Sequence, residues 1–269
     1  MSFRKRLPTA LVFLAIIFFI IQFAPSLVVF LFEQLIIIVS LLEFYKLSRK
    51  KKLFPQRTMG VILALIISLA FYFKEKISFE LALFICLLLA ALYFLISFDR
   101  IEKLAYFPSS IAITFFGAIY LSFPLNYFYP LKVEKGSFYI YFLFAVIFLG
   151  DTGAYLFGKL FGRRRMVPMA SPNKTWEGGF GGILFACLGA LAAQQILLRE
   201  VSIWLALLCG IFVHAIAQIS DPLESLFKRA VGVKDSSNML PGHGGFLDRI
   251  DSLILATPFF YYFIKFFWR

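Results

Sequence analysis

Cysteine is scarce in this sequence, and the three cysteines present do not form a recognisable site. Cys86, Cys187 and Cys209 each fall inside a strongly apolar run, and their spacing matches no metal-binding pattern. We therefore expect all three to be small buried hydrophobic side chains, and we expect no disulfide framework.

Charged residues are also rare. They make up 16% of the 269 residues, whereas 61% of the residues are hydrophobic, and the mean hydropathy is +0.86. There is no internal repeat and no low-complexity tract. This composition excludes an ordinary soluble domain and indicates that lipid surrounds much of the chain.

Long apolar runs dominate what is present. A bilayer core of about 30 Å takes about 20 apolar residues to cross as a helix, and the sequence holds about nine runs of roughly that length. The first run follows a basic "FRKR" but no small-x-small cleavage site closes it, so we interpret it as a retained signal anchor. The sequence predicts an all-α, polytopic integral membrane protein of about nine transmembrane helices, covering residues 7–23, 26–45, 58–73, 77–97, 104–123, 137–157, 176–198, 201–220 and 250–267.

Lysine and arginine are distributed unevenly between the predicted loops. If the N-terminus is cytoplasmic, 20 of the 27 lie on the cytoplasmic side. Positive residues that flank short loops stay in the cytoplasm, so we predict this orientation. The formal net charge of +12 is then mainly a topology signal, and part of it could attract anionic lipid headgroups or a polyanionic substrate. We expect no nucleic-acid partner.

Polar groups within the runs are concentrated in the second half of the chain. Residues 1–135 are predicted to be an N-terminal transmembrane scaffold of about five helices, in which Glu33, Glu43 and Glu80 lie near helix ends or on helix faces. Residues 136–269 are predicted to be the catalytic region, with about four helices and two long cytoplasmic loops.

The eighth run ends in "HAIAQISDPLES", which places His214, Gln218 and Asp221 at i, i+4 and i+7 on one helix face. Such a stripe in a membrane helix faces a bundle interior or a wet cavity and suggests a functional site. Interhelical hydrogen bonds would also explain His214 and Gln218. The "DPLE" segment fits a capping box as well, with Asp221 as the N-cap and Pro222 as the first helical residue.

More carboxylates and cations follow this stripe. Asp248 and Asp251 lie at i and i+3 where the ninth run begins. Asp221 and Asp248, from different helices, could converge on Mg²⁺, which usually takes one or two carboxylates and fills its shell with phosphate and water. Nearby basic residues could neutralise phosphates; these are Lys228, Arg229, Lys234 and Arg249.

A glycine-rich loop, "LPGHGG", lies between these groups. Gly242, Gly244 and Gly245 would let backbone N–H groups approach a phosphate closely. His243 in the same loop could position a phosphate, transfer a proton or have a structural role.

Two upstream segments add to the cluster. In "GDTGAY", Asp151 forms a polar turn with Thr152 and Tyr155 within the sixth run. In "SPNKTWEGGFGG", Lys174 follows a Ser-Pro-Asn turn and precedes a helix start, where an anionic ligand would be favoured.

Other residues in these segments have simpler interpretations. Gly178 and Gly182 form a small-xxx-small pattern that is typical of close helix packing, and Arg163, Arg164 and Arg165 are interpreted as topology markers. Together, the polar groups indicate a cytoplasm-facing, metal-dependent site for a phosphate-rich ligand at the membrane surface. They favour phosphoryl or nucleotidyl transfer on a lipid.

The run from Ser225 to Asp251, "SLFKRAVGVKDSSNMLPGHGGFLDRID", resembles the signature of phosphatidate cytidylyltransferases, also called CDP-diacylglycerol synthases. The shared elements are Ser then Lys-Arg, Lys-Asp, Leu-Pro-x-His-Gly-Gly and Asp-Arg-x-Asp, without a gap. "DTGAYLFGKLFGR" and "SPNKTWEGGFGG" are similar to the family's other recurrent stretches, in the same order, so the resemblance covers residues 136–269. Ser220 departs from the family's usual glycine and bears on how closely a backbone or ligand approaches there; we expect activity to survive.

The resemblance implies transfer of the cytidylyl group from CTP to phosphatidic acid, giving CDP-diacylglycerol and pyrophosphate in phospholipid synthesis. It also implies Mg²⁺ held by Asp221 and Asp248, a second cation such as K⁺, a homodimer, and a multi-pass protein of the cell (inner or plasma) membrane with a cytoplasmic active site. The predicted catalytic residues are Asp221, Asp248, Lys228, Arg229, Lys234, His243 and Arg249. The predicted substrate-binding residues are Asp151, Ser171, Lys174, Glu224, Ser225, Asp235, Gly244, Gly245 and Asp251.

Three other functions compete with this interpretation. CTP-dependent polyprenol kinases share parts of the polar architecture, but the complete signature argues against them. The "DG…AR…G…D…D" spacing of CDP-alcohol phosphotransferases is absent. A cation or proton transporter could use His214, Asp151 and Asp221 as a relay, but transport predicts ionisable groups at mid-membrane rather than carboxylates beside lysines at inside ends.

Overall fold

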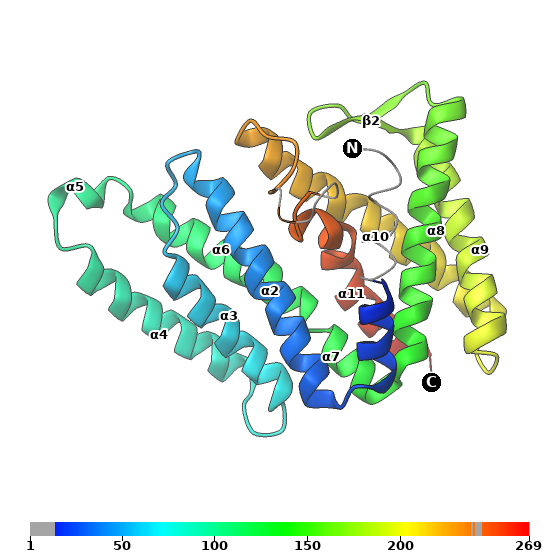
Figure 1. Ribbon diagram of the computed structural model, residues 1–269, viewed down its shortest axis with the longest axis horizontal. Coiled ribbons are helices and arrows are strands. Elements are labelled where there is room, and N and C mark those ends of the chain that lie inside the picture. The colour runs from blue at the N-terminus through cyan, green and yellow to red at the C-terminus, as the bar shows by residue number, and fades with distance from the viewer. Residues whose placement is uncertain (1–13, 238, 240–243, 269) are drawn as a thin grey trace. The chain divides into compact units, whose positions relative to one another are not determined.

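The structure is a computed structural model that describes residues 14–237, 239 and 244–268 (Figure 1). Within these residues it is helical apart from one two-stranded sheet, which confirms the predicted all-α, polytopic membrane fold. Seven of the described helices are long and apolar enough to cross a membrane, and Leu14–Phe23 and Arg57–Tyr72 are shorter apolar helices. These helices overlap the nine predicted runs as far as the structure describes them, while the number that cross the membrane stays a prediction.

The chain divides into two compact units. The first is formed by Met1–Pro130 with Asp235–Arg249. Its elements are α2 (Ser26–Arg49), α3 (Arg57–Tyr72), α4 (Phe79–Ser97), α5 (Ile101–Leu104), α6 (Phe107–Leu125) and α7 (Phe128–Pro130). Helices α2, α3, α4 and α6 lie side by side (Figure 1).

Tyr45 of α2 shows how the first unit packs. Its ring is fully buried, and its hydroxyl donates to the Thr114 carbonyl of α6 over 2.6 Å. A Cβ at Gly60 or Gly117 would overlap the ring, so glycine at these two positions makes room for a buried tyrosine. The hydroxyl is satisfied because a buried polar group without a partner would be costly in an apolar interior.

The second unit is formed by Leu131–Lys234 with Ile250–Arg269. Its elements are the π-helix η1 (Leu131–Lys135), α8 (Ser137–Phe161), β1 (Arg165–Val167), β2 (Ser171–Thr175), α9 (Trp176–Leu197) and α10 (Ile203–Ala230), joined by the larger part of α11 (Leu247–Phe267). Helices α8 and α9 run alongside each other, with the β1–β2 hairpin at one end (Figure 1). A Cβ at Gly178 would lie 2.8 Å from the Ala154 carbonyl oxygen, which confirms close helix packing as the role of this glycine.

Two local predictions were wrong. Asp221 does not cap a helix, because α10 continues through Pro222 to Ala230. A proline inside a helix removes one backbone hydrogen bond, but the turns beyond it bury Glu224 and Lys228 as an ion pair, which favours continuation. The Ser-Pro-Asn segment is not a turn but part of β2, which pairs antiparallel with β1; Pro172 is tolerated because a two-stranded hairpin leaves an edge unpaired.

Two of the three cysteines match the expected burial. Cys86 and Cys209 are buried, Cys187 is half-buried, and all three are free thiols.

Candidate active site

An ion pair between Lys174 and Asp221 is the centre of the polar cluster in the second unit. Lys174 Nζ lies 2.6 Å from Asp221 Oδ2, and the two side chains are 30% and 28% exposed. Thr175 fixes the junction between β2 and α9, because its hydroxyl accepts from the Gly178 N–H at 3.1 Å as the N-cap of α9. A strand and a helix thereby bring together two residues that the sequence predicts as site residues.

Two more carboxyl groups lie near the Lys174–Asp221 ion pair. Asp151 of α8 and Asp251 of α11 both lie close enough to Asp221 for their charges to interact. Asp221 Oδ1 also accepts from Ser225 Oγ at 3.3 Å, one turn later in α10. Three carboxyl groups thus lie around one lysine, and their oxygen atoms are the ligands that a hard cation prefers.

The carboxylates do not form a complete metal cage by themselves. Among the described residues, no group of three or more His, Cys, Asp or Glu side chains converges as a metal site. Mg²⁺ commonly takes only one or two carboxylates and completes its shell with phosphate oxygens and water. The donor chemistry of the cluster therefore fits a hard divalent cation that arrives with a phosphate-bearing substrate.

Ser220, the departure from the family signature, joins two helices of this site. Its side chain is fully buried, its hydroxyl donates to the Asp251 carbonyl of α11, and it accepts from the Leu255 N–H at 3.3 Å. The serine hydroxyl thus connects α10 to α11 beside Asp251.

We expect Ser220→Gly to lower stability while leaving activity within a few-fold of the wild type. The variant loses two hydrogen bonds and places glycine inside a helix, at a combined cost of about 1–3 kcal/mol. Thermal unfolding in detergent, alongside an activity assay, measures both effects. A loss of activity without a loss of stability would show that the hydroxyl takes part in the reaction.

Lys228 and Arg229 both have protein partners. Lys228 Nζ lies 2.5 Å from Glu224 Oε2, and the two side chains are 8% and 2% exposed. Arg229 Nε donates to the Ala170 carbonyl at 3.3 Å, which connects the end of α10 to the hairpin. Arg229 remains exposed and could still reach a phosphate, whereas Lys228 would have to leave Glu224 to do so.

Glu43 of the first unit, which sequence reasoning treated as a scaffold residue, holds the segment just before Asp248. It lies near the end of α2 and is 6% exposed, and its carboxylate accepts from Ser236 Oγ at 3.2 Å and Ser237 Oγ at 2.5 Å. It also accepts from the backbone N–H groups of Phe246 at 3.3 Å and Leu247 at 2.9 Å. A negative charge at these N–H groups, where α11 begins, is favourable for the helix.

Asp248, the other predicted metal ligand, lies in the same network of the first unit. Its Oδ2 accepts from the Ser236 N–H at 2.9 Å, the Ser236 hydroxyl at 2.8 Å and the Gly245 N–H at 2.8 Å. A Cβ at Gly245 would overlap Ser236 Oγ and the Glu43 carboxylate. Gly245 therefore allows its backbone to approach two carboxylates closely and uses its N–H on one of them. Glu43 and Asp248 therefore bind the described residues on both sides of the glycine-rich segment, Ser236 and Ser237 before it and residues 245–247 at its end.

The remaining predicted residues are distributed over both units. Gly244 has a left-handed φ of +80°, which favours glycine. Ser171 is half-buried in β2, and Lys234, Asp235 and Arg249 are exposed. His243 and Gly242 lie outside the described residues. Asp221 belongs to the second unit and Asp248 to the first, so their convergence on one ion stays a prediction.

The polar stripe of α10 has a partly structural explanation. Gln218 Nε2 donates to the Gly179 carbonyl of α9 at 3.0 Å, which confirms the interhelical hydrogen bond proposed for it. His214 is fully buried, and neither ring nitrogen has a hydrogen-bond partner among the described residues. Its ring occupies the space left by Gly150 and Gly182, where a Cβ would meet the imidazole.

Comparison with known proteins identifies the family of the chain. The Cytidylyltransferase family matches residues 4–267. A phosphatidate cytidylyltransferase of Staphylococcus epidermidis is 36% identical over 255 residues, which cover 95% of this chain and 96% of the relative. The protein of the same name from Staphylococcus saprophyticus is 34% identical over 255 residues with the same coverage, and that from Staphylococcus haemolyticus is 38% identical over 171 residues, or 64% of this chain and 65% of the relative.

The fold and the polar cluster define a multi-pass membrane protein with a site suited to a cation and phosphates. The match along almost the whole length shows that the chain belongs to the cytidylyltransferase family. Its relatives at 34–38% identity are phosphatidate cytidylyltransferases, which confirms the resemblance seen in the sequence.

Proposed function

We propose that this chain transfers the cytidylyl group of CTP to phosphatidic acid, releasing CDP-diacylglycerol and pyrophosphate. The observation that carries the proposal is the 36% identity over 95% of the chain to a phosphatidate cytidylyltransferase. The Lys174–Asp221 pair and the surrounding carboxylates support it, because they suit a metal-bound polyphosphate better than an uncharged substrate.

The proposed reaction needs no protein nucleophile. A phosphate oxygen of phosphatidic acid forms a bond to the α-phosphorus of CTP while the bond from that phosphorus to the β-phosphate bridging oxygen breaks, and pyrophosphate leaves with the electron pair. The protein contributes position and charge. We assign phosphate binding to the accessible cations Lys174, Arg229, Lys234 and Arg249. We also assign it to Lys228, which would have to exchange its ion pair with Glu224 for a phosphate.

Asp221 and Asp248 are proposed to hold Mg²⁺, which when bound would neutralise charge on the phosphates. Asp151 and Asp251 add to the negative potential around Asp221, and a second cation such as K⁺ is proposed to share it. Ser225 would orient Asp221 through the bond described above. The remaining proposed substrate-binding residues are Ser171, Glu224, Asp235, Gly244 and Gly245, and His243 is proposed to contact phosphate.

The proposed setting is the cell membrane, with the site facing the cytoplasm and the protein acting as a homodimer. The uneven distribution of lysine and arginine in the sequence supports the orientation. A cytoplasmic site would also meet CTP directly.

The proposal predicts that purified protein in detergent, given labelled CTP, phosphatidic acid and Mg²⁺, forms a lipid-soluble cytidine product and one equivalent of pyrophosphate. Replacing CTP by ATP, or omitting Mg²⁺, is expected to remove most of the product. If no product forms while reconstituted liposomes show a proton or cation flux, the chain is a transporter and the proposal is wrong.

A further inference from the structure

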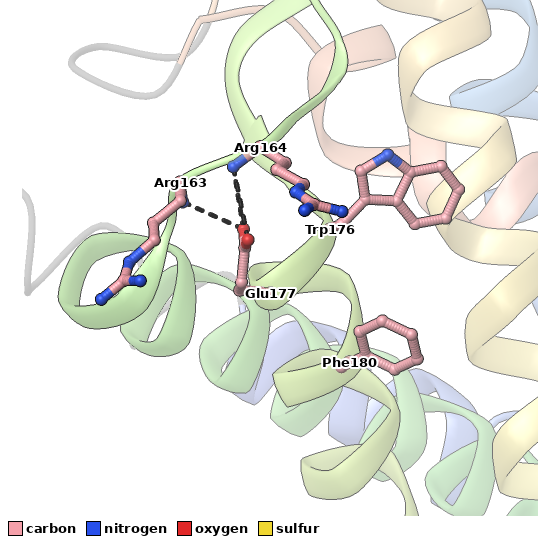
Figure 2. Close-up of a pocket in the computed structure, with 5 residues that line it drawn as sticks. All are labelled: Arg163, Arg164, Trp176, Glu177 and Phe180. Carbon is pink, nitrogen blue, oxygen red and sulfur yellow. Dashed lines mark hydrogen bonds between the residues drawn. The ribbon is translucent and has the colours of Figure 1, made fainter.

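A cavity of about 540 Å³ lies in the second unit, next to the hairpin (Figure 2). It is lined by Arg163, Arg164, Trp176, Glu177 and Phe180. None of these residues belongs to the polar cluster around Lys174 and Asp221. Its volume lies within the range of about 300–1,000 Å³ that is typical of ligand sites.

The two arginines of this cavity are available for an anion. Glu177 is the acidic residue of the lining, and its carboxylate accepts from the backbone N–H groups of Arg163 at 3.0 Å and Arg164 at 3.2 Å (Figure 2). It therefore fixes the main chain. In the described part of the molecule no carboxylate lies within ion-pair distance of either guanidinium, although the charge of Arg164 acts on Glu177 from further away. Both arginines are exposed, and guanidinium groups are well suited to phosphate oxygens. The Arg164 side chain extends toward Trp176, whereas the Arg163 side chain extends to the other side of Glu177 (Figure 2).

An apolar stripe begins at the same cavity and follows α9. Trp176 is 52% exposed, Phe180 70%, Leu184 52% and Leu188 52%. These four residues recur at intervals of four, so they form one ridge of the helix. Because α9 is long and apolar enough to span a membrane, the stripe leads from the arginines toward the hydrocarbon.

We propose that this cavity binds an anionic phospholipid, with the headgroup phosphate on Arg164, the charge of Arg163 adding to the attraction, and an acyl chain along the stripe. The assignment rests on the order of the groups along α9: the arginines and aromatic rings line the cavity, and the exposed leucines continue from it. A nucleotide would use the arginines and Trp176 but not Leu184 and Leu188, which lie two and three turns further along α9. Tryptophan at the start of the stripe also suits the headgroup level of a bilayer.

The test uses dioctanoyl phosphatidylglycerol, an anionic phospholipid that is not the proposed substrate, and measures its binding to the full-length protein in detergent by native mass spectrometry. The double variant Arg163→Gln/Arg164→Gln is expected to bind about thirtyfold more weakly, since each basic residue near a lipid surface contributes roughly fivefold. The Glu177 bonds are to main-chain N–H groups, so they persist in this variant. Arg165→Gln, on β1 and outside the lining, is the matched control and should bind within twofold of the wild type.

Two further arms separate the proposal from its competitors. Phe180→Ala is expected to weaken binding severalfold through lost apolar contact, and dioctanoyl phosphatidylcholine should bind far more weakly than phosphatidylglycerol. Equal binding of the two lipids, or no change in the double variant, would overturn the proposal. Displacement of the lipid by CTP would instead make the cavity a nucleotide site, and a disulfide-linked dimer of a Phe180→Cys variant that excludes lipid would make it a subunit contact. Each of these results is independent of the transferase assay.

Discussion

Asp221→Asn is expected to lower the rate of CDP-diacylglycerol formation about a thousandfold while the protein stays folded. Asparagine keeps the size of the side chain but removes the negative charge that Lys174 contacts at 2.6 Å, and it removes the proposed metal ligand. The ion pair is partly exposed and contributes only about 1 kcal/mol to stability. The loss should therefore appear in turnover and in the Mg²⁺ concentration needed for half-maximal rate, whereas size-exclusion behaviour and unfolding temperature stay close to the wild type.

Asp99→Asn is the matched control for this substitution. Asp99 contacts Lys103 at 2.6 Å, both side chains are well exposed, and the hydrogen bond from Lys103 lowers the pKa of Asp99. The change removes the same charge from a lysine–aspartate pair that lies outside the site, so activity should be unchanged. Full activity in Asp221→Asn would remove Asp221 from the proposed metal site.

Glu43→Ala is expected to destabilise the protein by about 3–5 kcal/mol and to abolish most of its activity. The carboxylate accepts hydrogen bonds from the Ser237 hydroxyl and two backbone N–H groups, and it shares the single proton of the Ser236 hydroxyl with Asp248. Hydrogen bonds to a charged group contribute about 1.5–3 kcal/mol each, but the substitution also removes the cost of burying a carboxylate, so the net loss is smaller than the sum of the bonds. The Ser236 hydroxyl also contacts Asp248, and the Gly245 N–H that donates to Asp248 lies next to Phe246 in the chain, so the position of that carboxylate should be lost as well.

The measurement is thermal unfolding in detergent combined with the cytidylyl-transfer assay. Glu43→Gln should have an intermediate effect, because its amide oxygen still accepts while its NH₂ group faces other donors. Glu75→Ala, at an exposed position between α3 and α4, is the control and should change neither quantity. An unfolding temperature of Glu43→Ala equal to that of the wild type would contradict a supporting role for the carboxylate.

The membrane fold could be predicted from composition and run length alone. The predicted run 137–157 corresponds to α8 (Ser137–Phe161) and the run 176–198 to α9 (Trp176–Leu197), because an apolar helix in lipid satisfies all of its backbone groups within itself. The length of an apolar run is a local property of the sequence, so these helices can be predicted without knowing any tertiary contact.

The helix boundary at Asp221 shows where local patterns are insufficient. "DPLE" matches a capping box, but the same letters are compatible with a helix that passes through proline if its next turns bury a paired Glu224 and Lys228. That pairing depends on the packing around α10, which spacing along the chain does not reveal.

The partners of site residues were the least accessible to sequence reasoning. Lys174 and Asp221 could be placed in one site by the family resemblance, but not as an ion pair, because no periodicity links a strand to a distant helix. Glu43 had no such signal. It lies near the end of an apolar run, as a scaffold residue would, and its donors come from the opposite end of the chain.

The separation between Glu43 and its donors also affects how the protein is made. Ser236 lies 193 residues after Glu43, and Leu247 lies 204 residues after it. At synthesis rates of about 5–20 residues per second, roughly 10–40 seconds pass between the appearance of the acid and that of its donors. During this interval α2 carries a carboxylate whose final hydrogen bonds do not yet exist, so the N-terminal unit cannot reach its finished packing while it is being inserted. Its maturation waits for the last fifth of the chain to leave the ribosome.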